Sequence, residues 1–398
     1  MLTVEQALEA ILSRIPRLGT ERVDIPGALG RVLAEPIVAR REIPPWPNSS
    51  MDGYAVRAED TRRGAALAVV GRVEAGAVPA RGVGPGEAMR IFTGAPLPPG
   101  ADAVVPQEDV ESGDGRIALR GPAEPSAYVR QRGEDVQAGA RVLEPGTVLT
   151  AAEIGLLATL GHGQVPVHRR PRVAILSTGN ELADLGTEPE PGQIPNTNTY
   201  SLMAQVLEAG GDAVNLGVAR DRLDAIEDRV RAARGADALV SSAGVSVGEL
   251  DLVREALARA GAELHLWQVA MRPGKPITFG SLGPRPVWGL PGNPVSAMVT
   301  FELFVRPALL KMGGRRRLTR PSIRARAMET VPNPGSRRGY LRVRLEATAQ
   351  GLGARLTGEQ GSAILRSMVS ADGLAVVPPD TVIPMGAELE IILLRDLP

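Results

Sequence analysis

The feature that most constrains the fold is an alternation of strand-like and helix-like segments across residues 172–314. Short apolar runs alternate there with longer segments whose apolar residues recur at helical spacing. This alternation is typical of a doubly wound α/β sheet, in which helices connect the strands. We expect strands over residues 173–177, 213–218, 237–241, 264–269 and 277–289, and helices over residues 199–209, 223–234, 248–260 and 295–310.

Three of the predicted strands end in loops of small or hydrogen-bonding residues. The segments are RVAILSTGNE at 172–181, DALVSSAGVSVGELD at 237–251 and VWGLPGNPVSA at 287–297. In the second, Ser246 and Glu249 fit a capping box, so a small-residue turn would lead into a helix N-terminus, which favours anions. An ordinary strand-to-helix connection uses the same residue types, so the turn alone leaves both interpretations open. Since ligands of open α/β sheets bind outside the carboxyl ends of strands, the three loops could converge on one ligand.

Composition excludes several kinds of site. Among the 398 residues there are 0 Cys and 3 His, so disulfides, thiolate catalysis, iron–sulfur clusters and multi-His metal sites are not expected. Lys plus Arg and Asp plus Glu both number 45, so no excess charge points to nucleic acid or to a membrane surface. The Rossmann and P-loop glycine patterns are absent. With no apolar run of membrane-spanning length and no signal pattern, we expect a soluble cytoplasmic protein.

The segments around the α/β region are predicted to be helical and then β-rich. A capping box at Thr3 indicates an N-terminal helix. Short alternating runs over residues 54–148 indicate an inserted β-domain with a hairpin turn at Asp114 and Gly115, and residues 322–394 are typical of a small barrel or sandwich. The domains expected are a discontinuous N-terminal helical domain (1–44 and 139–170), the inserted β-domain (45–138), the α/β domain (171–315) and a C-terminal β-domain (316–398).

Charged residues recur where the predicted strands end. Glu181, Asp221 and Asp251 each follow a strand or its turn, and Arg272 and Lys275 lie in the motif RPGKP. Singly, each acid could be a solvated loop residue or a helix cap. Together they predict carboxylates and cations at one edge of the sheet. Carboxylates suit Mg²⁺ and the cations suit an oxyanion, a pairing used in phosphoryl and adenylyl chemistry. No activated Ser–His pair is found, so covalent catalysis is not expected.

Long motifs follow one another in a fixed order along the chain. They are PNSSMDGYA at 47–55, RIFTGAPLPPGADAVV at 90–105, RGEDV at 132–136, STGNEL at 177–182, SSAGVSVGELD at 241–251, RPGKP at 272–276 and LPGNPVSA at 290–297. In these motifs, and over essentially its whole length, the chain resembles the molybdopterin molybdenumtransferases, the family of bacterial MoeA-like proteins and of one domain of gephyrin.

This resemblance implies a reaction and an assembly. Such enzymes insert molybdenum from molybdate into the dithiolene of adenylated molybdopterin and release AMP in the presence of Mg²⁺. The resemblance also implies an elongated homodimer, in which the active cleft of the α/β domain receives a contribution from the β-domain of the partner subunit. An adenylyltransferase partner that delivers the substrate is a further expectation.

The resemblance further implies roles for individual residues. The residues implied around the chemical step are Asp52, Thr93, Asp135, Glu181, Asp221, Asp251 and Lys275. Those implied to bind the pterin substrate are Thr178, Gly179, Ser242, Ala243, Gly244, Ser246, Pro291, Gly292, Asn293 and Pro294. Molybdate is implied at Arg272, Lys275, Ser296, Arg342 and Ser362, and Mg²⁺ at Asp221 and Asp251. Two positions depart from the usual pattern, since Arg272 stands where Lys is frequent and Ala243 where Gly is also common.

Two other functions fit parts of the sequence. An adenylyltransferase for the preceding step, which uses ATP, would also suit the α/β region, although such relatives are usually a single α/β domain. A non-enzymatic scaffold that binds a partner peptide, as gephyrin does, would leave the charged loop residues without a role. Molybdate and tungstate both fit the sequence as the oxyanion reactant.

Overall fold

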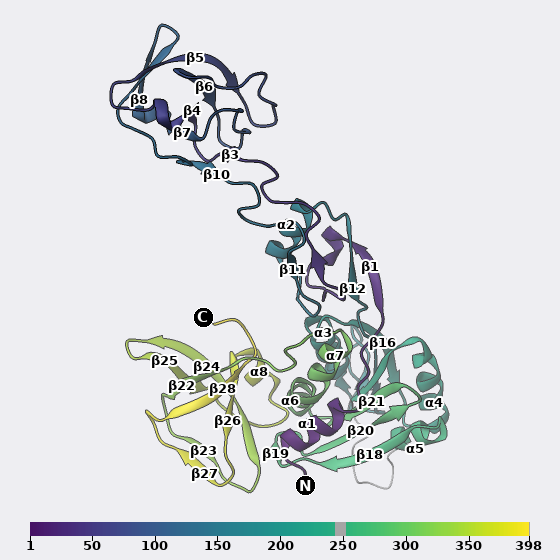
Figure 1. The fold of residues 1–398 in the computed structure, drawn as a ribbon. Coiled ribbons are helices and arrows are strands. Elements are labelled where there is room, and N and C mark those ends of the chain that lie inside the picture. Colours follow the sequence, from purple (N-terminus) through teal and green to yellow (C-terminus); the bar gives the residue numbers. More distant parts are fainter. Residues whose placement is uncertain (243–251, 398) are drawn as a thin grey trace. The chain divides into compact units, whose positions relative to one another are not determined.

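The computed structural model describes residues 1–242 and 252–397, which divide into two compact units. Unit 1 comprises residues 1–34, 146–154 and 164–398, and unit 2 comprises residues 35–145 and 155–163. Unit 1 contains the α/β sheet and the C-terminal β strands, and unit 2 contains most of the β-rich insert (Figure 1). The finer division into four domains stays a prediction. No helix of the described chain is long and apolar enough to cross a membrane.

The α/β sheet of unit 1 has six strands, four of them parallel. Their spatial order is β16 (Asp212–Ala219), β13 (Arg172–Thr178), β17 (Ala238–Ser242), β21 (Arg285–Leu290), β20 (Pro276–Leu282) and β18 (Glu263–Gln268). The first four run parallel, whereas β20 and β18 are antiparallel to their neighbours. The predicted α/β fold is confirmed, and the stretch predicted at residues 277–289 is a hairpin of two strands.

Helices cover both faces of this sheet (Figure 1). They are α1 (Val4–Leu12), α3 (Thr197–Glu208), α4 (Leu223–Ala232), α5 (Leu252–Arg259), α6 (Pro294–Thr300) and α7 (Arg306–Met312). Strand β13 is buried at every position after Arg172. Its alternate residues Val173 and Ile175 pack in one core with α1 and α3, and Ala174 and Leu176 pack in a second core with α4 and α5. Burial on both faces explains why the strand reads as a continuous apolar run.

The single helix predicted over residues 295–310 is interrupted by a π-helical segment. Helix α6 passes into η5 (Phe301–Val305), and α7 follows directly. Pro307 at the start of α7 has no N–H to donate to the preceding turn. The π-helical segment, whose hydrogen bonds join residues five apart, accommodates the missing donor without ending the helix.

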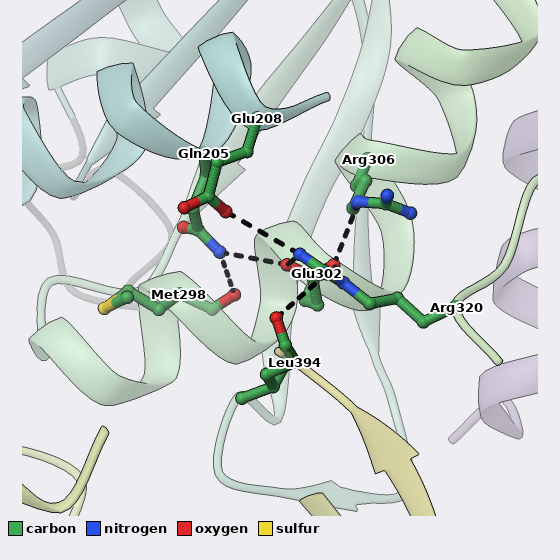
Figure 2. A network of polar contacts seen from close by, with 7 residues as sticks. All are labelled: Gln205, Glu208, Met298, Glu302, Arg306, Arg320 and Leu394. Atoms are coloured by element: carbon green, nitrogen blue, oxygen red, sulfur yellow. Dashed lines mark hydrogen bonds and ion pairs between the residues drawn. The ribbon is translucent and has the colours of Figure 1, made fainter. Parts of the chain in front are cut away.

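A buried carboxylate in η5 ties the helices to the C-terminal strands (Figure 2). The Glu302 side chain is 4% exposed and lies 3.2 Å from Arg306 and 2.5 Å from Arg320. Gln205 of α3 donates to the same carboxylate at 3.3 Å, and Arg320 donates to the Leu394 carbonyl at 2.9 Å. This network therefore joins α3, η5 and the linker before the C-terminal strands.

The C-terminal strands form a closed five-stranded barrel. The order is β24 (Arg338–Thr348), β25 (Gly351–Leu356), β22 (Ser322–Ala327), β28 (Glu388–Leu393) and β26 (Gly373–Val377), and β26 pairs again with β24. The short strand β19 (Met271–Arg272) pairs with the start of β24, so the RPGKP segment is attached to the barrel. Of the barrel and the sandwich that the sequence allowed, the barrel is present.

Unit 2 is built on a six-stranded sheet of short strands. Their order is β7 (Ala103–Pro106), β4 (Gly53–Val56), β6 (Glu87–Ile91), β5 (Ala66–Val73), β9 (Arg116–Leu119) and β8 (Val110–Gly113). Asp114 and Gly115 join β8 to β9 with φ values of 49° and 74°, which confirms the predicted hairpin turn. The capping box at Thr3 is also confirmed.

Shorter elements complete both units. In unit 2 they are β2 (Ile37–Val38), β3 (Asn48–Ser49), β10 (Val129–Arg130) and β11 (Arg141–Leu143). In unit 1 they are β1 (Thr20–Asp24), β12 (Gln164–His168), β14 (Leu182–Ala183), β15 (Ile194–Pro195), β23 (Val331–Asn333), α8 (Leu365–Val369) and β27 (Thr381–Ile383). Helix α2 (Ala151–Thr159) is shared between the units.

Candidate active site

The carboxyl ends of the four parallel strands meet at one edge of the α/β sheet. In register, Thr178 of β13 is paired with Ala219 of β16, and Ser242 of β17 is paired with Leu290 of β21. Ser242 is also paired with Ser177 of β13. The loops after β16, β13 and β21 therefore leave the sheet at the same edge, where ligand-binding loops of α/β sheets are found.

The RPGKP segment begins at the same edge. Strand β20 is antiparallel to β21, and its Thr278 is paired with Gly289 near the end of β21. Gln268 at the end of β18 is paired with Pro276 at the start of β20. Residues 269–275, which carry Arg272 and Lys275, therefore connect β18 to β20 beside the carboxyl ends of the parallel strands.

Two exposed carboxylates lie on the loops after β13 and β16. The backbone N–H of Asn180 donates to the Asp221 carboxylate at 3.1 Å, and the Asp221 N–H donates to the Asn180 side chain at 3.2 Å. These reciprocal bonds hold the two loops together. Gly179 has a φ of +149°, and a Cβ at this position would lie 2.3 Å from a carboxylate oxygen of Glu181, so the loop requires glycine there.

A small pocket of about 90 Å³ opens between these loops. Its lining comes from the strand ends, their loops and the start of α3, and it includes Thr178, Glu181, Asn198, Ser242, Gly292 and Pro294. Asn198 joins two of the loops, because its Nδ2 donates to Ser242 Oγ at 2.6 Å and to the Gly292 carbonyl at 2.7 Å. Sequence reasoning missed Asn198. The polar run NTNT at 196–199, just where an amphipathic helix begins, was the available signal.

Three cations of the predicted site lack carboxylate partners among the described residues, and two of them, Arg272 and Arg342, lie close enough for the charge of one to act on the other. No Asp or Glu oxygen in the described part of the chain lies within 4.0 Å of Arg272, Lys275 or Arg342, although Arg342 is completely buried. Burial, and then the nearby charge of Arg272, lower the pKa of Arg342 to about 10, so it stays protonated at neutral pH. Burying an uncompensated charge is costly, which makes this cluster a candidate anion site.

The remaining residues of the predicted molybdate site lie on neighbouring segments. A Cβ on Gly274, whose φ is +97°, would lie 2.4 Å from Thr300 Oγ1 and 3.7 Å from the Ser296 carbonyl, so the RPGKP segment packs closely on α6. Asn293 Nδ2 donates to Ser362 Oγ at 3.1 Å, and the Val295 N–H donates to the Ser362 carbonyl at 3.0 Å. The barrel thus contacts the PGNP loop, which also contains Pro291 and Gly292.

Three predicted residues belong to unit 2. Asp52 Oδ1 accepts hydrogen bonds from the N–H and the hydroxyl of Thr93, each at 2.8 Å. The backbone bond from Thr93, followed by the hydroxyl bond, holds the pKa of Asp52 below its ordinary value. Asp135 is exposed, and its N–H donates to the Ile43 carbonyl at 2.9 Å. The predicted residues Ala243, Gly244, Ser246 and Asp251, and the expected helix start at Ser246, lie outside the described residues.

The described carboxylates suit a cation that keeps part of its water shell. Within residues 1–242 and 252–397, no group of three or more His, Asp or Glu could hold a metal ion. Glu181 and Asp221 are exposed, and neither forms an ion pair with another described residue. Mg²⁺ commonly binds one or two carboxylates together with phosphate oxygens and waters, so this donor set fits it.

Family models cover nearly the whole chain. The MoeA N-terminal region, domains I and II, matches residues 2–161, a probable molybdopterin binding domain matches residues 174–311, and the MoeA C-terminal region, domain IV, matches residues 324–394. The structure of a molybdopterin biosynthesis MoeA protein from Pyrococcus horikoshii superposes with a TM-score of 0.84 at 36% identity and covers 100% of both chains.

Sequence relatives agree with these matches. The molybdopterin molybdenumtransferase of a Nostoc species is 38% identical over 99% of this chain and 94% of its own length. Molybdopterin molybdenumtransferase 2 of Mycobacterium tuberculosis is 39% identical over 93% of this chain and 94% of its own length. The chain therefore belongs to the molybdopterin molybdenumtransferases, the enzyme family of MoeA.

Proposed function

We propose that this enzyme inserts molybdenum from molybdate into adenylated molybdopterin and releases AMP, with Mg²⁺ as cofactor. One observation carries the proposal. Exposed carboxylates, a pocket lined by hydroxyl and backbone groups, and the RPGKP segment with Arg272 and Lys275 all lie at the same edge of the α/β sheet. A substrate that carries phosphates and an oxyanion reactant would meet complementary groups there. The molybdenumtransferase name of the relatives supports the same reaction.

The pocket between the loops would bind the adenylated pterin. Thr178, Gly179 and Ser242 offer backbone and hydroxyl donors, and Asn198 holds Ser242 in place. Ala243, Gly244 and Ser246 would extend this cradle, together with the PGNP loop. Pro294 begins α6, so the helix N-terminus would add a favourable dipole for phosphate. The expected contribution of these residues is binding and orientation.

The carboxylates would hold the cofactor. Asp221 and Asp251 are proposed as Mg²⁺ ligands, and Glu181 as a further acidic group of the site. Bound Mg²⁺ would supply charge neutralisation at the phosphate oxygens and polarise the phosphorus–oxygen bond that breaks. Asp221→Asn should raise the Mg²⁺ concentration needed for half-maximal AMP release, whereas the surface variant Asp224→Asn should not. An unchanged Mg²⁺ dependence of Asp221→Asn would refute the assignment.

The cations would hold the second reactant. Arg272, Lys275 and Arg342 are proposed to bind molybdate, with Ser296 and Ser362 as hydrogen-bond partners. Holding both reactants together can supply about 7–11 kcal/mol of the barrier reduction. The charge of the site suits a dianion better than a monoanion, because three cations lack carboxylate partners among the described residues.

We further propose a cytoplasmic homodimer in which Asp52, Thr93 and Asp135 act in the site of the partner subunit. Thr93 fixes the Asp52 carboxylate, which suits a group that must approach a substrate in a defined orientation. Co-expression of Asp52→Asn with Lys275→Ala tests this, because a mixed dimer then contains one intact site. About a quarter of the wild-type rate is expected from random pairing. A rate no higher than that of either variant alone would refute action across the dimer.

The reaction itself is tested by AMP release from purified adenylated molybdopterin with Mg²⁺, with and without molybdate, and without ATP. The proposal predicts release that depends on molybdate. Release that needs ATP in place of molybdate would instead favour the adenylyltransferase function. If the enzyme binds adenylated molybdopterin tightly but releases no AMP in any of these conditions, insertion with molybdate is contradicted. Tungstate and an added partner protein would then be tested.

A further inference from the structure

The barrel supplies a buried arginine, and a residue of the short helix α8 forms one of the two hydrogen bonds that hold it. Arg342 lies on β24 and is completely buried. Its Nε donates to Ser367 Oγ at 3.0 Å, and its Nη2 donates to the Gly361 carbonyl at 3.1 Å. The edge of the guanidinium formed by Nε and Nη2 is therefore occupied by protein groups.

The third nitrogen of the same guanidinium has no partner. Nη1 of Arg342 is buried and makes no hydrogen bond with any described residue. A buried donor left unpaired costs free energy, and the cost is larger for a charged group. The charge of Arg272 lies close enough to disfavour the protonated form, so the surroundings do not compensate the cation. An unpaired donor beside a second cation is what an oxyanion ligand would satisfy.

Ser367 is arranged to accept the Nε hydrogen bond. It lies in α8 and is 3% exposed. Its hydroxyl donates its only proton to the Ile364 carbonyl at 2.7 Å, so an oxygen lone pair remains for Arg342. Because the guanidinium is planar, fixing Nε and Nη2 also fixes the direction of Nη1.

We propose that Ser367 is a positioning residue that holds the Arg342 guanidinium so that Nη1 is presented to the bound oxyanion. The proposal rests on the proposed function in one respect, namely that the oxyanion is molybdate. Ser367 itself touches neither reactant. Its effect should therefore appear in the binding of the anion and not in the chemistry of a saturated enzyme.

The test compares Ser367→Ala and Ser367→Thr with Ser370→Ala, a matched control at the end of the same helix. Molybdate binding to the full-length protein is measured by calorimetry without pterin. Loss of a hydrogen bond to a charged group should weaken binding about tenfold in Ser367→Ala. Ser367→Thr, which keeps the hydroxyl, should restore most of the affinity, and Ser370→Ala should bind as the wild type. In turnover, the KM for molybdate should rise about tenfold with kcat nearly unchanged.

A second readout does not depend on the identity of the anion. In protein labelled with ¹⁵N-arginine, hydrogen exchange at Arg342 Nε should accelerate in Ser367→Ala and remain slow in Ser367→Thr and Ser370→Ala. Unchanged exchange in Ser367→Ala overturns the positioning role, as does a fall in kcat without a change in KM. If wild-type protein binds no molybdate while Nε exchange responds as predicted, the positioning role stands and the proposed oxyanion is wrong.

Discussion

Replacing Glu302 by Gln should destabilise unit 1 by removing the only carboxylate that pairs with Arg306 among the described residues. The change keeps the size of the side chain but deletes its charge. Figure 2 shows both arginines beside the Glu302 carboxylate. Arg306 and Arg320 are only 15% and 17% exposed, so both cations would remain largely desolvated. Burial lowers the pKa of Arg306, whereas the charge of Glu302 raises it, so loss of Glu302 removes an interaction that favours the charged form.

The size of the effect follows from these contacts. Removing one partner of a buried ion pair typically costs about 3–5 kcal/mol. Arg320 keeps a weaker partner, Glu208, at 3.7 Å, and the glutamine that replaces Glu302 could still accept a hydrogen bond from one arginine. We therefore expect a loss near the lower end, about 3 kcal/mol. Glu208→Gln is the matched control, because Glu208 pairs with the same arginine but is 64% exposed, and such exposed pairs contribute about 0–1 kcal/mol.

Urea unfolding followed by tryptophan fluorescence measures the difference. Trp288 is completely buried in β21, so it reports the unfolding of the α/β sheet. Midpoints are compared, because a chain with two units need not unfold in a single step. Glu302→Gln should lower the midpoint by about 1 M and Glu208→Gln by far less. Equal midpoints for Glu302→Gln and wild type, or equal shifts for both variants, would show that the buried charge of Glu302 does not stabilise unit 1.

Three further predictions concern the site. Lys275→Ala should raise the half-saturating molybdate concentration for AMP release about tenfold or more, because it removes a charged partner of the anion, and an unchanged value would exclude Lys275 from the anion site. Gly274→Ala should lower the free energy of unfolding by about 1–3 kcal/mol and weaken molybdate binding, since residue 274 has a positive φ and its new Cβ would clash with Thr300. The control Gly283→Ala has a φ of +61° but no atom within 4 Å of the new Cβ, so it should leave molybdate binding unchanged. Thr93→Val should raise the pKa of Asp52 only part of the way to its ordinary value, because the backbone bond from residue 93 is kept, and an NMR titration measures this pKa. The lowered pKa of Asp52 gives a stabilisation that is present above the ordinary aspartate pKa and is lost as pH falls through the lowered pKa. In the variant this loss should occur at a higher pH.

Local sequence patterns predicted much of the fold. The apolar run of β13 identified a strand buried on both faces, and Asp114 with Gly115 identified a tight hairpin. The signals for these features lie within a few neighbouring residues. For the same reason, loops at strand ends could be recognised as ligand-binding candidates before their arrangement was known.

Features made by distant residues were not predictable in this way. The pairing of β26 with β24, which closes the barrel, depends on strand order and not on local pattern. Ser367 reads as an ordinary helix residue until its contact with Arg342 is seen, and Asn198 as a residue of a polar helix start until its bonds to Ser242 and Gly292 are seen. Each of these contacts joins residues that are distant in the chain, so local sequence patterns do not predict which partner each residue has.

Measuring molybdenum and AMP together in a single turnover tests whether the enzyme couples molybdenum insertion to AMP release. Adenylated molybdopterin, Mg²⁺ and molybdate are mixed with the enzyme without ATP, and the released AMP and the molybdenum bound to pterin are quantified in the same sample. Coupled insertion should give equal amounts of both and no AMP when molybdate is omitted. AMP release that leaves the pterin without molybdenum would contradict it.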